Sequence, residues 1–296
     1  MEKKVYSSEI ERDIRSAVEN FEIVLREQVA RNQLMRAERE ERGAADKTGD
    51  LAPNSNIDKV IIGTAAGDGI GPIIMTEAEK VLKAVLRDRL ASGSLILKPI
   101  EGFTLENRLA AGKTVPDSVM AAMNECDVLL KGPTTTPNAA MNTANIESAN
   151  VYLRKSFDLF ANVRPVAIPE EGIDWTFFRE NTEGEYALGS KGEYITGELA
   201  LDFKVTTDEG TERIARAAYE YARANGKKRV SIVTKANIMK KTDGNFLNIC
   251  REVAKEYPEI ETDSWFIDIM AANLVNKEIR NNFQVFVLPN LYGDII

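Results

Sequence analysis

The fold is decided by a stretch that reads VIIGTAAGDGIGP at residues 60–72 and continues into a helical pattern over residues 73–90. Residues 60–63 form a short apolar run of the kind found in buried strands, and the glycines after it permit a tight turn. Proline is tolerated in the first turn of a helix, because the N–H that it lacks has no helical partner there. The stretch therefore predicts a strand, a turn and a helix in an α/β sheet.

The glycine turn has two possible roles, and its spacing alone does not decide between them. It runs G-x-G-x-G-P at residues 67–72, whereas a dinucleotide-binding turn runs G-x-G-x-x-G and a P-loop ends in Gly-Lys-Ser or Gly-Lys-Thr. The turn is therefore either a tight structural connection or a cradle for a ligand.

The same alternation of strands and helices continues toward the C-terminus. Apolar runs predict strands at residues 95–100, 127–130, 230–234, 262–267 and 285–288, and helical periodicity predicts helices at residues 115–124, 211–225, 244–257 and 271–277. Residues 154–205 are richer in aromatic and turn-forming side chains. Alternation of this kind implies a parallel sheet with helices packed on it.

A helix is also predicted over residues 7–42, before the first strand. Ser8 and Glu11 have the spacing of a capping box. Apolar residues recur at helical spacing and form a stripe on one face: Ile10, Ile14, Val18, Phe21, Leu25 and Val29. The stripe could pack on the body of the protein, or it could contact a second subunit or another partner. Residues 43–56 read as a linker.

The amino-acid composition excludes several chemistries. The 296 residues include no histidine and two cysteines, Cys126 and Cys250. Nucleophile pairs that use histidine, a disulfide framework and a cysteine-rich zinc site are therefore excluded. A metal would need oxygen ligands, which suit Mg²⁺, Mn²⁺ or Ca²⁺. Acid–base chemistry would fall to Asp, Glu, Lys, Tyr or Cys side chains.

The net charge and the distribution of apolar residues indicate which partners and which cellular location to expect. Lys and Arg number 38 against 46 Asp and Glu, which gives a formal net charge of −8 and argues against a nucleic-acid partner. No apolar run approaches the length of a membrane span, and the charged N-terminus lacks the apolar core of a secretory signal. The cysteines and the acid-rich N-terminus, unlike a mitochondrial transit peptide, predict a cytoplasmic protein.

Six segments then follow one another in a recognisable order. They are GDGIGP (residues 67–72), KGP (131–133), LRKSFDLFANVRP (153–165), RENTEGEY (179–186), KANIMK (235–240) and NLYGD (290–294). The series resembles the isocitrate/isopropylmalate dehydrogenase family of metal-dependent β-decarboxylating dehydrogenases over residues 59–296. The resemblance implies a two-domain α/β fold with a parallel or mixed sheet. It places an N-terminal arm and linker at residues 1–56, part of a large cofactor domain at 57–159, and a small domain with a clasp-like insertion (about 184–210) at 160–296.

Within that family the sequence is most similar to the isocitrate enzymes. Ser148 and Asn150 resemble their substrate loop, and RENTEGEY is the form that isocitrate, homoisocitrate and tartrate enzymes share. The resemblance implies that Arg154, Arg164 and Arg179 bind carboxylates of isocitrate, since guanidinium matches a carboxylate in a bidentate manner. Homoisocitrate, tartrate or 3-isopropylmalate remain alternative substrates.

The resemblance also assigns the chemistry, which is oxidation of the alcohol to a ketone followed by loss of the β-carboxylate. Tyr186 and Lys235 correspond to the proton donor and to the general base or relay. The expected cofactors are NAD or NADP, with NAD preferred, and Mg²⁺ or Mn²⁺. The remaining assigned residues are Asp268 and Asp294 as metal ligands and Thr136 and Asn237 near the nicotinamide.

Family active sites are shared across a dimer, so the resemblance implies a homodimer in which Lys235 and Asp268 come from the partner subunit. Family members also continue past the segment that matches residues 290–296. We therefore expect an isocitrate dehydrogenase with an incomplete large domain, which is inactive alone, or a non-catalytic, fragmentary paralogue.

Overall fold

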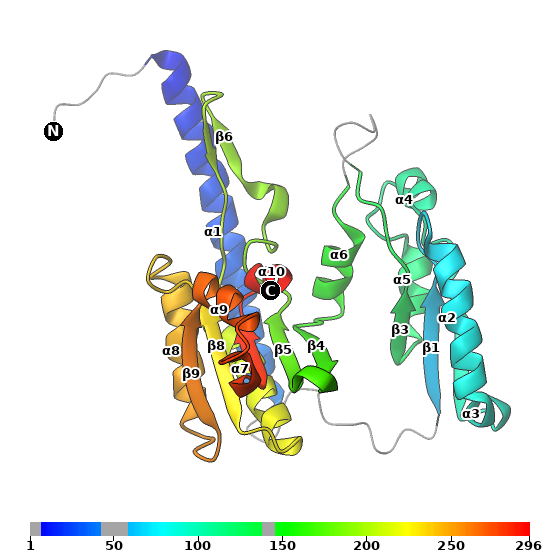
Figure 1. The fold of residues 1–296 in the computed structure, drawn as a ribbon. Coiled ribbons are helices and arrows are strands. Elements are labelled where there is room, and N and C mark those ends of the chain that lie inside the picture. The colour runs from blue at the N-terminus through cyan, green and yellow to red at the C-terminus, as the bar shows by residue number, and fades with distance from the viewer. Residues whose placement is uncertain (1–6, 43–58, 138–145) are drawn as a thin grey trace. The chain divides into compact units, whose positions relative to one another are not determined.

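The computed structural model describes residues 7–42, 59–137 and 146–296, which group into two compact units. The first unit spans residues 53–157, and the second combines residues 1–52 with residues 158–296. Figure 1 shows helices and strands in both units, which confirms the predicted α/β class. The linker predicted at residues 43–56 lies outside the described residues.

The first unit is built on a three-stranded parallel sheet in the order β2-β1-β3. Its strands are β1 (Val60–Ala65), β2 (Leu95–Pro99) and β3 (Val128–Lys131), and its helices are α2 (Gly71–Val85), α3 (Arg87–Ala91), α4 (Leu105–Ala111), α5 (Asp117–Asn124) and α6 (Ala149–Ser156). The predicted strand–turn–helix unit is confirmed, although the helix predicted to reach residue 90 divides at Leu86, whose backbone is not helical. Helices α4 and α6 had not been predicted.

The glycine turn packs tightly on the loop that follows β3. Gly67 has φ +74°, and a Cβ atom built on it would lie 2.1 Å from the carbonyl oxygen of Pro133. The Asp68 N–H donates to that same carbonyl at 2.7 Å, and the Asp68 carboxylate accepts the backbone N–H groups of Leu105 (2.6 Å) and Thr135 (2.8 Å). These contacts give the turn a structural role, because Gly67 and Asp68 tie it to the loop that follows β3.

The second unit contains a five-stranded mixed sheet in the order β4-β5-β10-β8-β9, in which only β4 runs antiparallel to its neighbour. Its strands are β4 (Ala161–Ile168), β5 (Ile173–Glu180), β8 (Arg229–Thr234), β9 (Glu261–Phe266) and β10 (Val285–Leu288), and its helices are α7 (Asp208–Ala224), α8 (Thr242–Ala254), α9 (Ile267–Leu274) and α10 (Tyr292–Ile295). All four residues of β10 are buried. That burial explains the unbroken apolar run, since a central strand covered on both faces has no polar side.

Helix α7 shows how the sequence builds this unit. The Thr207 hydroxyl caps its N-terminus by accepting the N–H of Gly210. Ile214, Ala218 and Ala222 recur at helical spacing and are fully buried in a core that includes β8, β10 and α8. The short hairpin β6 (Glu193–Ile195) and β7 (Leu199–Leu201) precedes this helix.

The predicted N-terminal helix is confirmed as α1 (Ser8–Arg42), and it lies alongside β6 in Figure 1. Phe21 packs edge-on against Phe203 with ring centroids 5.0 Å apart, and the Asn20 side chain donates to Glu193 at 2.7 Å. An ion pair between Glu27 and Lys191 adds a third contact. No described helix, α1 included, is long and apolar enough to cross a membrane.

Two details predicted for α1 are wrong. The cap is Ser7 rather than Ser8, because the Ser7 hydroxyl accepts the N–H of Ile10 at 3.3 Å. The buried face carries Ala17 and Val24, whereas four residues of the predicted stripe are exposed, namely Ile14, Val18, Leu25 and Val29. The helix does pack on the body of the protein, but through a neighbouring face.

Candidate functional site

The candidate site of the second unit lies where β5 and β10 end. Parallel pairing sets Leu288 of β10 beside Arg179 of β5, and antiparallel pairing sets Asn162 of β4 on the other side of Arg179. The segment that follows β10 therefore returns to the end of β5, at the edge of the sheet where α/β proteins commonly place ligands. Helix α10 in that segment carries Asp294.

Arg179 is the buried centre of this site, with only 1% of its surface exposed. Its Nε and Nη2 atoms donate to Asn290 Oδ1 at 3.0 and 2.6 Å, and its Nη1 atom donates to Asp294 Oδ1 at 2.8 Å. A Cβ atom on Gly293 would approach the Arg179 side chain to 2.5 Å, so the glycine makes room for the arginine. The guanidinium is therefore fixed in one direction by a fully buried amide.

Three predicted residues converge on Asp294. Arg179 binds Oδ1, the Arg164 guanidinium lies 3.6 Å from the same oxygen, and the Tyr186 hydroxyl donates to Oδ2 at 2.7 Å. The hydrogen bond from Tyr186 and the two arginine charges lower the pKa of Asp294 below its ordinary value. The structure thus brings Arg164, Arg179, Tyr186 and Asp294 together as two cations and a phenol around one carboxylate.

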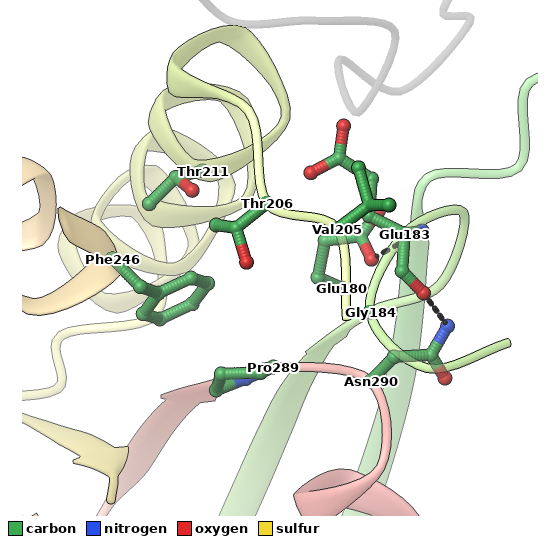
Figure 2. Close-up of a pocket in the computed structure, with 9 residues that line it drawn as sticks. All are labelled: Glu180, Glu183, Gly184, Val205, Thr206, Thr211, Phe246, Pro289 and Asn290. Atoms are coloured by element: carbon green, nitrogen blue, oxygen red, sulfur yellow. Dashed lines mark hydrogen bonds between the residues drawn. The ribbon is translucent and has the colours of Figure 1, made fainter. Parts of the chain in front are cut away.

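Glu180 and Glu183 line a small cavity together with Asn290, as Figure 2 shows. Glu180 accepts the N–H and hydroxyl of Thr182 (2.8 and 2.6 Å) and the N–H of Glu183 (2.7 Å). Burial first, and the neighbouring Glu183 charge second, raise the pKa of Glu180 to about 7. The cavity beside the pair has a volume of about 10 Å³, which suits a single water molecule rather than a substrate.

Lys235 and Asp268 form a separate pair at the carboxyl ends of β8 and β9. Parallel register sets Thr234 beside Phe266, which brings the residues that follow them together. Lys235 Nζ lies 2.5 Å from Asp268 Oδ1, and this hydrogen bond is the largest cause that lowers the pKa of Asp268. Asn237 is exposed in the turn that follows. No ion pair or hydrogen bond between described residues joins Asp268 to Asp294.

The two predicted metal ligands meet part of the needs of a divalent cation. Both aspartates have lowered pKa values, so at neutral pH they carry the ionised carboxylates that Mg²⁺ and Mn²⁺ prefer. Within the described part of one chain, however, no three His, Cys, Asp or Glu side chains gather as a metal site would require. The carboxylates suit the metal chemically, and further ligands would have to complete the set.

The first unit holds the other predicted residues. Ser148 is the N-cap residue of α6, and its hydroxyl makes no capping hydrogen bond. Asn150 and Arg154 follow on one face of this helix, four residues apart, and Asn150 Oδ1 accepts the Thr134 hydroxyl at 3.3 Å. Thr136 is exposed. Ser148, Asn150 and Arg154 thus lie together on α6 and at its start.

Sequence reasoning missed two residues that organise these segments. Asn290 fixes Arg179, and it lies in a motif from which only Asp294 had been selected. Arg108 is fully buried and donates to the carbonyl oxygens of Thr114, Thr135 and Glu147 at 2.8, 2.9 and 3.3 Å. Two of these carbonyls precede Thr136 and Ser148 directly. A lone arginine in a segment that had not been predicted to be helical gave no signal of this role.

Comparison with known proteins gives a consistent picture. The family model of isocitrate/isopropylmalate dehydrogenase matches residues 61–296. The NAD isocitrate dehydrogenase subunit 2 of Schizosaccharomyces pombe is 38% identical over 237 residues, which cover 78% of this chain and 59% of that protein. One regulatory subunit of the Dictyostelium discoideum NAD enzyme is 39% identical over 248 residues, covering 82% of this chain and 64% of that protein.

A solved structure agrees with these relatives. The crystal structure of isocitrate dehydrogenase from Methylococcus capsulatus matches with a TM-score of 0.67 and 35% identity, covering 80% of this chain and 68% of that chain. The chain spans about three fifths of the length of the two relatives above.

The predicted cytoplasmic location is wrong. Both of those relatives are named as mitochondrial proteins, as are similar subunits of Caenorhabditis elegans and Saccharomyces cerevisiae. Unpaired cysteines indicate a reducing compartment and do not distinguish one such compartment from another. The choice of the cytoplasm therefore rested on the acid-rich residues 1–11, which do not decide the location.

Proposed function

The chain belongs to the isocitrate/isopropylmalate dehydrogenase family, and on that basis we propose that it takes part in the NAD-dependent oxidative decarboxylation of isocitrate. The observation that carries this proposal is the convergence of Arg164 and Arg179 on a single carboxylate, with the Tyr186 hydroxyl on its other oxygen. Such an array suits a substrate that carries several carboxylates, because charge-assisted and bidentate hydrogen bonds are the strong ones.

Residues with proposed carboxylate-binding roles are found in each of the two units. Arg164 has 42% of its side chain exposed and so reaches solvent beside the buried Arg179. Arg154 and Asn150 on α6, with Ser148 at its start, would bind the remaining carboxylates, including the one that 3-isopropylmalate lacks. Guanidinium groups suit a tricarboxylate, because an acidic protein needs local positive charge in order to hold it.

The reaction would oxidise the substrate hydroxyl by hydride transfer to the nicotinamide and then release the β-carboxylate as CO₂. Tyr186 is the proposed proton donor to the carbon that loses this carboxylate, and its hydroxyl is held by Asp294 at 2.7 Å. Lys235, paired with Asp268, is the proposed base or relay for the hydroxyl proton. Thr136 and Asn237, both exposed, are proposed to contact the nicotinamide.

A divalent cation bound by Asp268 and Asp294 would supply Lewis-acid stabilisation of negative charge on the substrate oxygen. Since one chain does not gather a closed set of such ligands in its described part, we propose that a second subunit contributes Lys235 and Asp268 to each site. The second subunit is either a copy of this chain or a related protein, because several relatives are named as subunits of an NAD isocitrate dehydrogenase.

A non-catalytic role is the second candidate. Some of the matched relatives are named regulatory subunits, including one that is 39% identical to this chain. A regulatory subunit would keep the arginines that bind isocitrate and would not need Tyr186 or Lys235. The intact contacts of these two residues with Asp294 and Asp268 favour the catalytic role.

The proposal is tested by measuring isocitrate binding in the presence of Mn²⁺, together with isocitrate-dependent reduction of NAD⁺ and NADP⁺. Both the 296-residue chain and the product of its whole gene are used, with 3-isopropylmalate, homoisocitrate and tartrate as competing substrates. Turnover of isocitrate supports the catalytic role, and binding without turnover supports the regulatory role. If neither the 296-residue chain nor the whole gene product binds isocitrate, the catalytic role and the regulatory role are both contradicted.

Replacing Tyr186 with phenylalanine removes the hydroxyl that Asp294 holds and leaves the ring in place. We expect turnover of isocitrate to fall about 100-fold with little change in binding, since a positioned proton donor typically contributes 10²–10⁴-fold. Steady-state NAD⁺ reduction measures the loss. Tyr194→Phe is the matched control, because Tyr194 is 70% exposed on the hairpin. Full activity in the Tyr186→Phe variant would remove Tyr186 from the mechanism.

A further inference from the structure

Helix α1 precedes residue 61, where the family match begins. It nevertheless contacts Glu183, which lies close in sequence to Arg179 and Tyr186 of the candidate site. The Arg31 guanidinium lies 3.5 Å from the Glu183 carboxylate. The Arg31 side chain is 30% exposed, whereas the Glu183 side chain is only 2% exposed. The helix therefore delivers a positive charge from the surface to a carboxylate that solvent does not reach.

This carboxylate needs a counter-charge because a second one lies beside it. Glu180 is 3% exposed, and its pKa is raised to about 7 by burial and by the charge of Glu183. Glu183 accepts the N–H and hydroxyl of Thr207, and a Cβ atom on Gly210 would lie 2.6 Å from the Glu183 carboxyl carbon. Neutral donors and close packing thus hold the pair in place without balancing its charge.

The charged groups near the pair come from two helices. Arg213 of α7 donates to the Thr182 hydroxyl at 3.0 Å and forms an ion pair with Asp158 at 2.7 Å. Arg31 of α1 is the cation whose ion pair is with Glu183 itself. Among the ion pairs of the described residues, no other cation reaches Glu180 or Glu183, so Arg31 is the direct electrostatic partner of this pair.

The pair is connected to the candidate site by an unbroken series of hydrogen bonds. The Glu183 carbonyl oxygen accepts the side-chain N–H of Asn290 at 2.9 Å. Asn290 in turn holds the guanidinium of Arg179, and Arg179 binds Asp294, which also accepts the Tyr186 hydroxyl. Asn290 is fully buried, so a shift of the Glu183 backbone would displace the group that orients Arg179.

We propose that Arg31 is a positioning residue: by balancing the charge of Glu183 it holds residues 180–184 where Asn290 and Arg179 orient Asp294 and Tyr186. The inference rests on the proposed function only in taking the cluster around Asp294 to be the isocitrate site. Its tests follow stability and backbone exchange, so they remain informative if isocitrate proves not to be the substrate.

The first test is the pH dependence of thermal unfolding. The pKa of Glu180 in the folded protein, about 7, exceeds its ordinary value of 4.5, so the stability that Glu180 contributes is present below pH 4.5 and is lost as the pH rises to about 7. Removal of Arg31 should extend this loss above pH 7. We expect Arg31→Gln to lower the melting temperature by about 3 °C at pH 8 and by about 1 °C or less at pH 5.5.

Two variants separate this effect from a general loss of charge. Arg26→Gln removes an arginine of the same helix whose ion pair is with the exposed Glu22, and it should lower the melting temperature equally little at both pH values. Arg31→Lys keeps the charge and should recover most of the loss at pH 8. A deficit in Arg31→Gln that matches Arg26→Gln at both pH values would overturn the proposal.

The second test asks whether the effect passes through Glu183 to the site. Arg31→Gln should add no further loss in a Glu183→Gln background, because the charge that Arg31 balances is then absent. Hydrogen exchange of the full chain at pH 8 should quicken at least threefold in residues 181–188 and 290–294 in Arg31→Gln and stay unchanged in Arg26→Gln. Unchanged exchange in both segments, or an Arg31→Gln effect that persists in the Glu183→Gln background, would refute the coupling.

Discussion

Replacing Arg179 with methionine should lower the free energy of unfolding by about 3 kcal/mol and weaken isocitrate binding at least 100-fold. Methionine retains the packing of the aliphatic stem but leaves Asn290 Oδ1 without its two donors in a fully buried position. It also removes the closer of the two guanidinium groups that hold Asp294. The variant should lose stability and isocitrate affinity together, because the buried Arg179 guanidinium both satisfies Asn290 and holds Asp294.

The matched variant is Arg164→Met, on the neighbouring strand. Arg164 is 42% exposed and holds no fully buried amide, so this variant should weaken isocitrate binding while unfolding within about 1 kcal/mol of the parent. Urea denaturation followed by tryptophan fluorescence measures the stability, because Trp175 and Trp265 both lie in the second unit. Equal stability losses in the two variants would show that burial of Arg179 is not the cause.

Replacing Arg108 with methionine should destabilise the first unit by about 3 kcal/mol. The fully buried guanidinium satisfies three backbone carbonyls and lies 4.0 Å from the Asp68 carboxylate. Buried acceptors without partners typically cost 1–3 kcal/mol each, and some would be recovered by water. Since two of the carbonyls belong to Thr135 and Glu147, the loop–helix segment that carries Ser148 should lose its order before the sheet does.

The measurement must suit the unit concerned. The chain has two tryptophans, and neither lies in residues 53–157, so tryptophan fluorescence does not report on the first unit. Hydrogen exchange of peptides from residues 60–137 and 146–157 does. Lys113→Met is the control, because Lys113 is half exposed and forms an ion pair with the exposed Asp117. Protection in Arg108→Met that equals that of the control would contradict the role given to the three hydrogen bonds.

The features that could be predicted from sequence are those set by neighbours along the chain. The strand, glycine turn and helix of residues 60–85 follow from local patterning, and residues 285–288 read as a buried strand because all four are apolar. The site residues were proposed from motif order, and the structure gathers those of the second unit in two groups, one around Asp294 and one formed by Lys235 and Asp268.

What the sequence did not reveal depends on contacts between distant residues. Helix α1 carries apolar residues on two neighbouring faces, and contacts with distant residues such as Phe203 bury the face of Ala17 and Val24. The roles of Arg108 and Asn290 likewise require carbonyls and side chains that only the folded chain brings near. Periodicity indicates that a face will be buried but does not say which surface will cover it.

Helix α1 is synthesised well before the residues on which it docks. The hydrogen bond from Asn20 to Glu193 joins residues 173 positions apart, and the Glu27–Lys191 pair joins residues 164 apart. At roughly 5–20 residues per second, the ribosome would need on the order of 10–30 s to make the surface that covers the helix. During that interval the face of α1 that carries Ala17 and Val24 is open to solvent, because the residues that cover it, about 191–203, have not yet been made.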